Sequence, residues 1–144
     1  MKNKKILILG SEEKFSIEKM YERSFKNLRY KVSFFHIYNI RKNFFYRFSW
    51  KYLRFLHFYL IRLKIINYLK NKNNFDLIII FKGLYLKKNF INQIKLICKK
   101  SKVINILTDD PFNINYFKDI SNRNLLKSVP EFDHIFIFSK RILR

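Results

Sequence analysis

The stretch Leu77-Ile78-Ile79-Ile80-Phe81 decides the fold, because it is an unbroken run of apolar residues. A strand with one face in water alternates apolar and polar side chains, and this run does not. Its residues are mostly β-branched, which suits a strand. The pattern is therefore typical of a strand that is covered on both faces, as the strands of a parallel sheet are.

Similar apolar runs occur at residues 5–9, 32–35, 103–107 and 134–138. Segments of helical character lie between them. Residues 16–28 have a candidate cap in Ser16, and the following residues are expected on the inward face of that helix: Ile17, Met20, Tyr21, Phe25 and Leu28. Residues 89–100 form a second expected helix, with these residues inward: Phe90, Ile91, Ile94, Ile97 and Cys98.

Strands that alternate with helices predict βαβ units with right-handed crossovers. We therefore expect an α/β fold, a Rossmann-like doubly wound parallel sheet of about five strands. The 144 residues fit one domain, and a hydrophobic fraction of 49% excludes a disordered chain. No apolar run approaches the roughly 18 residues of a spanning helix, and residues 6–9 are too few for a signal peptide. A cytoplasmic location is expected.

The formal net charge is +21, which would suit a nucleic-acid-binding protein. A second explanation is compositional. Lys, Asn, Ile, Phe and Tyr have AT-rich codons, so an AT-rich genome would raise the basic count without selection for a ligand. Both explanations stay open, and the charge alone decides nothing.

The long crossover at residues 41–74 contains no acidic residue, and its basic side chains recur at roughly helical spacing. The plainest interpretation is a helix that packs on the sheet. The second is contact with an anionic membrane surface at the inner face of the membrane, where basic and aromatic helices bind. Nucleic acid is the third. The candidate contact residues are Arg47, Lys51, Arg54 and Arg62.

Ligands of open parallel sheets bind at the carboxyl ends of the strands. The candidate substrate-binding residues there are Gly10, Ser11, Lys82, Gly83, Asp110 and Pro111. The catalytic candidates are Asp109 and Asp110, as paired carboxylates, and His36 at a strand end. For each, a structural role is the alternative: a tight turn at Gly10, a solvated cation at Lys82, and an extended residue before proline at Asp110.

Other kinds of chemistry find little support in the sequence. No histidine or further acid stands at ligand spacing near Asp109, so no metal site is expected. Neither G-x-G-x-x-G nor a P-loop occurs, which argues against a small nucleotide-binding regulator. His57 and His134 are expected to be structural. Cys98 is the only cysteine, which excludes an internal disulfide, and it is expected in the core.

The segments 76–83, 104–112 and 132–140 together resemble the N-terminal domain of CgeB-like glycosyltransferases. In that family a strand ending in Lys-Gly, a strand ending in Asp-Asp-Pro and a strand beginning near Tyr-Asp follow in this order. Here they correspond to Lys82-Gly83, Asp109-Asp110-Pro111 and Phe132-Asp133, where Phe132 departs from the usual Tyr.

The resemblance implies the acceptor-side half of a GT-B enzyme, truncated at the C-terminus and inactive without a C-terminal domain that would hold the nucleotide-sugar donor. It implies a glycan, lipid-linked or protein acceptor, with no cofactor in this half. The alternative is a stand-alone basic α/β module that binds an anionic membrane surface or nucleic acid. Against nucleic acid, the chain lacks a recognition-helix, RRM or KH signature.

Overall fold

The computed structural model describes residues 4–11, 13–37, 53–72, 74–83, 85–108 and 120–138, without the side chains of residues 54 and 120–122. One sheet contains five strands: β1 (Lys5–Gly10), β2 (Lys31–His36), β3 (Leu77–Phe81), β4 (Lys102–Leu107) and β5 (His134–Ile137). Their order is β2-β1-β3-β4-β5, and all neighbours are parallel. This is one of the common doubly wound arrangements, so the predicted Rossmann-like α/β fold is confirmed.

Strand β3 shows why the deciding run has no alternation. Ile78 and Ile80 enter the larger core on one face of the sheet, and Ile79 and Phe81 enter the smaller core on the other. All four are at most 1% exposed. Each face therefore needs apolar side chains, as in any strand between two helix layers.

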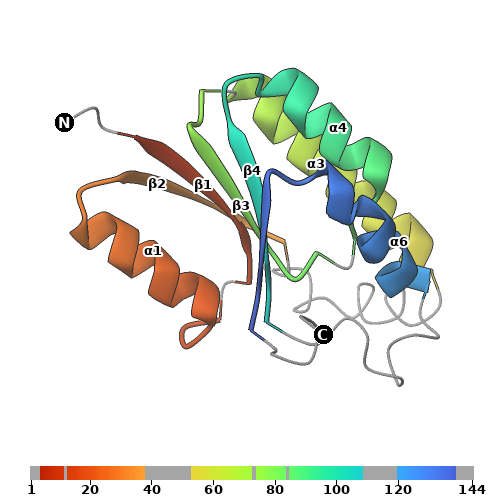
Figure 1. Ribbon diagram of the computed structural model, residues 1–144, viewed down its shortest axis with the longest axis horizontal. Coiled ribbons are helices and arrows are strands. Elements are labelled where there is room, and N and C mark those ends of the chain that lie inside the picture. Colours follow the sequence, from red (N-terminus) through yellow and green to blue (C-terminus); the bar gives the residue numbers. More distant parts are fainter. Residues whose placement is uncertain are drawn as a thin grey trace.

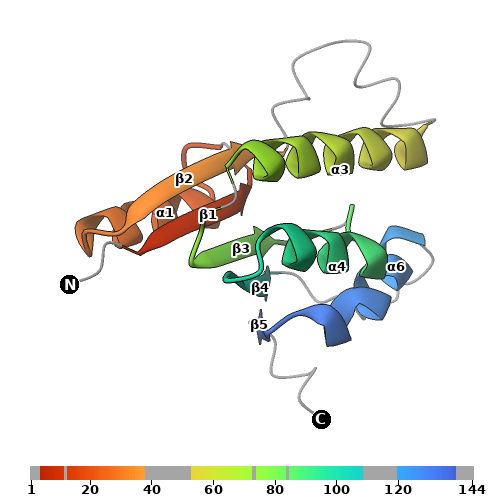
Figure 2. The same ribbon diagram turned by 90° about the horizontal axis from the view of Figure 1, so that it is seen from above.

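The helices cover the two faces unequally (Figures 1 and 2). Helix α1 (Ile17–Asn27) packs on one face, over the smaller core. Helices α3 (Arg54–Asn71), α4 (Lys88–Ile97) and α6 (Ile120–Ser128) lie on the other face, and the 3-10 turn η2 (Val129–Glu131) leads into β5. The sequence analysis did not predict α6.

Helix α1 begins as predicted, with the Ser16 hydroxyl accepting a hydrogen bond from the Lys19 N–H at 3.3 Å. Its predicted inward face is partly wrong, because Met20 and Leu28 are 59% and 65% exposed. The helix is rotated so that Glu18 and Glu22 are buried instead. The following contacts make this rotation favourable: Tyr21 with Phe81, Phe25 with Tyr30, and Glu22 with Lys19 and Lys26.

The helices on the other face follow the sequence expectation. In α4, Phe90, Ile91 and Ile94 are buried, as is Cys98 just beyond its end. In α3, the residues that pack against the sheet recur every four positions: Ile61, Ile65 and Leu69. The interpretation that the long crossover packs on the sheet is thus confirmed for residues 53–72, the part that the structure describes.

Two aspartates fix the amino ends of neighbouring strands. The Asp76 carboxylate accepts a hydrogen bond from the Lys5 N–H at 2.7 Å, which joins the starts of β3 and β1. The Asp133 carboxylate accepts from the Val103 N–H at 2.7 Å, which joins β5 to β4. Both lie at the sheet edge opposite the carboxyl ends of the strands.

Candidate functional site

The topology brings four of the predicted binding residues to one place. Strands β1 and β3 are neighbours although β2 separates them in sequence, so the chain changes direction across the sheet between them. Gly10 and Ser11 end β1, and Lys82 and Gly83 follow β3. This is the topological switch point, where open α/β sheets bind their ligands.

Gly10 is closed off by the protein itself. A Cβ at position 10 would lie 2.5 Å from Cγ of Glu18, so the buried Glu18 side chain needs the space that glycine leaves. The Ser11 N–H donates to the Glu18 carboxylate at 3.4 Å. The N-terminus of α1 is therefore already occupied by the carboxylate of Glu18. A ligand phosphate placed there would be repelled by this carboxylate.

Lys82 and Gly83 form a tight turn rather than a continuation of β3. Both have positive φ, 59° and 87°. A Cβ on Gly83 would lie 2.3 Å from Cδ1 of Leu86, so this position requires glycine. The Lys82 N–H donates to the Ile106 carbonyl at 3.0 Å, and the Lys82 side chain is exposed at the edge.

Asn105 supports this turn, and the sequence analysis missed it. It is fully buried in β4, and its Nδ2 donates to the Ile80 carbonyl at 2.9 Å. Its Oδ1 and the Thr108 Oγ1, just beyond β4, are buried without a hydrogen-bond partner. One polar residue inside the apolar run 103–107 was the available signal, because a buried amide needs a specific role.

Of the remaining candidates at this edge, His36 is the one that lies within the described residues. His36 pairs in register with Gly10 but lies on the edge strand β2, with its ring stacked on Phe34 at 4.7 Å between centroids. Asp109, Asp110 and Pro111 lie outside the described residues, as do Arg47 and Lys51. The side chain of Arg54 is also outside them.

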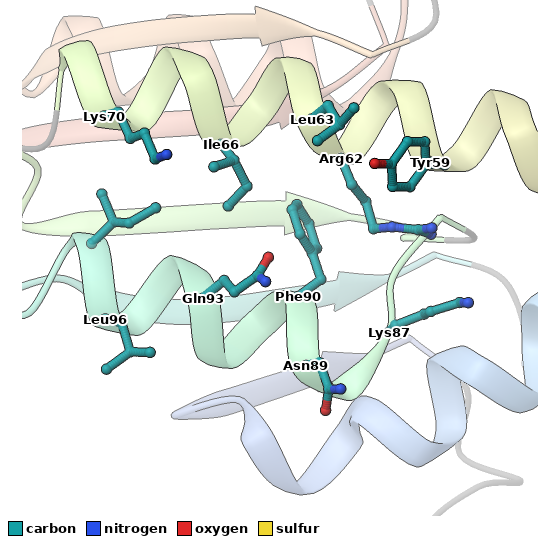
Figure 3. Close-up of a pocket in the computed structure, with 11 residues that line it drawn as sticks. Tyr59, Arg62, Leu63, Ile66, Lys70, Lys87, Asn89, Phe90, Gln93 and Leu96 are labelled. Carbon is teal, nitrogen blue, oxygen red and sulfur yellow. The ribbon is translucent and has the colours of Figure 1, made fainter.

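A second candidate site is a groove between α3 and α4 of about 560 Å³, open to solvent along one side (Figure 3). Helix α3 contributes Tyr59, Arg62, Leu63, Ile66 and Lys70. Helix α4 and the residue before it contribute Lys87, Asn89, Phe90, Gln93, Leu96 and Ile97. The lining is largely apolar, contains three cations and includes no acid.

Arg62 is the polar anchor of the groove. Its guanidinium donates to the Tyr85 carbonyl at 2.9 Å, which ties α3 to the turn before α4. Burial lowers the pKa of Arg62, and the neighbouring Tyr59 partly offsets this. No carboxylate of the described residues forms an ion pair with it. Of the four predicted basic contact residues, Arg62 is the one whose side chain the structure describes.

His57 in α3 is buried, with 3% exposure. Burial, and then the nearby charge of Lys64, lower its pKa. Within the described ranges, no three His, Cys, Asp or Glu side chains are grouped so that they could hold a metal ion. None of the described helices is long and apolar enough to cross a membrane.

These features define a Rossmann-like α/β domain in which Glu18 fills the space beside Gly10, with an open groove on the three-helix face. A putative pilus assembly-related protein from Burkholderia pseudomallei has a similar fold, with a TM-score of 0.52 and 14% identity. The alignment covers 98% of this chain and 84% of that protein. No protein-family model matches the sequence, and no curated protein matches it either.

The resemblance to CgeB-like glycosyltransferases is therefore wrong. No family model supports it, and the structural match is to a putative pilus assembly-related protein. Two of the three motifs have structural explanations, and Asp109-Asp110-Pro111 lies outside the described residues. Asp76 and Asp133 hold strand ends, and Lys82-Gly83 forms a turn that any similar sheet connection could use. The transferase function that rested on this resemblance is left without support.

Proposed function

We propose that this chain is a binding module that attaches peripherally to an anionic membrane surface through α3. The observation that carries the proposal is a stripe of apolar side chains on the outer side of α3, called the α3 stripe below. Its members, each between 41% and 75% exposed, are Phe55, Leu56, Tyr59, Leu60 and Leu63.

The α3 stripe lies opposite the residues that pack on the sheet. Buried residues recur at positions 57, 61, 65 and 69, and the stripe occupies the other side of the helix. A contiguous exposed apolar surface of this kind marks an interaction site. In the second half of α3 the outer side carries Asn67 and Lys70 instead.

The charges favour a membrane as the neighbour. Residues 41–74 contain no acid in a chain of net charge +21. Each Lys or Arg near an anionic leaflet contributes about 1 kcal/mol, and each half-exposed Leu or Phe that is inserted contributes on the order of 1 kcal/mol. Several of each give reversible binding in about the micromolar to millimolar range. The name of the structural neighbour would also agree with an assembly role.

Vesicle co-sedimentation tests the proposal. The protein is expected to bind vesicles that contain phosphatidylglycerol, to bind pure phosphatidylcholine weakly, and to dissociate as the salt concentration rises. Changing Phe55→Ser with Leu60→Ser should weaken binding by roughly tenfold or more, because two inserted side chains are lost. Circular dichroism should be unchanged, since both residues are exposed.

The matched control removes the same residue types from the α1 side. Phe15→Ser with Leu28→Ser deletes two side chains that are 87% and 65% exposed, and it should leave vesicle binding unchanged. Equal losses in both double variants would contradict the proposal. So would tighter binding to duplex DNA or RNA than to anionic vesicles, which would assign the positive charge to nucleic acid.

A further inference from the structure

The groove between α3 and α4 carries more positive charge at one end than at the other. Figure 3 shows Tyr59, Arg62 and Lys87 at the end nearest the carboxyl ends of the strands, and Ile66 and Phe90 between the helices. The N-terminus of α4, which begins at Lys88, is at that same end. Two cations and a positive helix terminus therefore meet there, apolar side chains line the middle of the groove, and a single cation, Lys70, lies at the opposite end.

Arg62 is incompletely compensated in its position. Its guanidinium has five N–H donors, and one carbonyl accepts from it at 2.9 Å. Among the described residues no carboxylate pairs with this partly desolvated cation, which is unfavourable, and an anion at this end would relieve it. Of the described acids that contact α4, Glu131 pairs with Lys88 at 3.1 Å and Asp133 pairs with Lys95 at 3.2 Å.

The body of the groove suits a narrow apolar ligand. Its volume of about 560 Å³ lies within the range of roughly 300–1,000 Å³ that is usual for small-molecule sites, and is small for a docked protein partner. Leu63, Ile66 and Ile97 line it beside the ring of Phe90. Tyr59 and Leu63 belong both to the groove and to the α3 stripe, so the two surfaces are continuous.

We propose that this groove binds one single-chain anionic amphiphile, with its phosphate or carboxylate head at Arg62 and Lys87 and its chain over Ile66 and Phe90. The proposal deepens the proposed membrane attachment and rests on it for the source of the ligand. A bilayer that contacts the α3 stripe would present such molecules directly at the mouth of the groove.

Titration with monomeric lysophosphatidylglycerol, below its critical micelle concentration, tests the site without a membrane. Native mass spectrometry and isothermal titration calorimetry should both show one bound molecule per chain. Lysophosphatidylcholine, which has the same chain and no net charge, should bind at least tenfold more weakly. Inorganic phosphate should compete only at much higher concentration, because it lacks the chain.

Matched variants separate the two parts of the ligand. Ile66→Trp fills the groove and should abolish binding, whereas Leu60→Trp adds the same ring outside the groove and should not. Lys87→Gln should weaken binding about tenfold while leaving the Arg62 hydrogen bond intact, and Lys64→Gln should have little effect. Urea denaturation of each variant establishes that it is folded.

The outcomes distinguish this proposal from the proposed function. Vesicle binding without binding of the monomeric lipid would overturn the groove site and leave the membrane proposal standing. Monomer binding that Ile66→Trp abolishes, without vesicle binding, would support the groove and contradict the membrane proposal. Competition by phosphate as strong as by the lipid, or binding of an acidic amphipathic peptide alone, would overturn the amphiphile assignment.

Discussion

Gly10 stands where β1 ends against α1, and its missing side chain makes room for Glu18. A methyl group there would lie 2.5 Å from Cγ and 3.1 Å from Cβ of Glu18. We expect Gly10→Ala to lower the free energy of unfolding by about 1–3 kcal/mol, because the crowded glutamate is buried and has little room to move. Equilibrium urea denaturation measures this loss.

A double-mutant cycle identifies the cause. Glu18→Ala removes the crowding atoms, so Gly10→Ala should cost much less in that background than in the native chain. If the two losses simply add, the glycine is needed for another reason, such as a ligand at the switch point.

Asp133 contributes stability that depends on pH. Burial would raise its pKa, but the hydrogen bonds from the Val103 N–H and Lys95 outweigh this and lower it. The charged form is thus favoured in the folded state, so the stabilisation is present above the unfolded pKa of about 3.9 and is lost as the pH falls through the lower folded value. Asp133→Asn should lower the free energy of unfolding by about 1–2 kcal/mol at neutral pH. It should also make the free energy of unfolding, measured by urea denaturation, fall less steeply as the pH is lowered.

Glu131→Gln is the control for Asp133→Asn, because it removes the same charge two residues away. Its ion pair is with Lys88, whose side chain is 60% exposed, and Glu131 itself is 20% exposed. Such pairs contribute little, so this variant should lose well under 1 kcal/mol in free energy of unfolding. Its loss of stability at low pH should match that of the native chain. Similar losses in both variants would mean that net charge, rather than the Val103 hydrogen bond, is responsible.

Single residues were the hardest scale to predict from the sequence. The capping role of Ser16 and the burial of Cys98 followed from local patterns, and both are seen. The roles of Glu18 and Asn105 could not be predicted in this way, because the partner of each side chain lies on another element, apart from it in sequence. Asp76 and Asp133 were interpreted as family motifs, although hydrogen bonds to neighbouring strands explain them.

At the scale of the element, α3 combines a buried histidine with an apolar exterior. His57 packs toward the sheet with a lowered pKa, so its neutral form is favoured in the folded protein. Between the unfolded pKa of about 6.5 and the lower folded value, the unfolded chain binds more protons, and stability falls as the pH falls. This window lies above that of Asp133, so the two effects can be separated.

His57→Leu should remove this part of the pH dependence. We expect the native chain to lose stability between pH values of about 7.5 and 5.5, and the variant to lose less over the same interval. The slope of the free energy of unfolding against pH is the readout, so an overall change in stability from the new side chain does not affect the test. An unchanged slope would show that another group titrates there.

The elements themselves could largely be predicted. Continuous apolar runs located all five strands, and four-residue spacing located the buried side of α4. Helix α6 was missed because its sequence, Ile-Ser-Asn-Arg-Asn-Leu-Leu-Lys-Ser, has little periodicity. Of its described residues, Leu125 and Ser128 are buried. The rotation of α1 was also missed, because two buried glutamates run against hydrophobic patterning.

At the scale of the molecule, the groove could not be predicted, because it exists only where α3 and α4 lie side by side. Their lining residues are 17 or more positions apart in sequence, and the sheet beneath sets the spacing of the helices. The two faces also differ in cover. Phe136 in β5 and Phe138 just after it are 53% and 60% exposed, and the described chain places no helix over β5 on the side of the sheet that α1 occupies.

The net charge of +21 raises the question of whether binding to anionic surfaces is local or general. Lys70 and Lys87 line the groove, and two exposed lysines that do not line it are Lys14, before α1, and Lys31, at the start of the edge strand β2. Changing either pair to Gln lowers the net charge by the same amount.

If α3 and the groove form the contact surface, the Lys70/Lys87 double variant should bind phosphatidylglycerol vesicles several-fold more weakly, at about 1 kcal/mol per lysine. The Lys14/Lys31 double variant should retain nearly native binding at physiological salt, because screening over about 8 Å weakens the attraction of charges outside the contact surface. Equal weakening would mean that the overall charge, which an AT-rich genome can produce by itself, attracts the vesicles without a defined site.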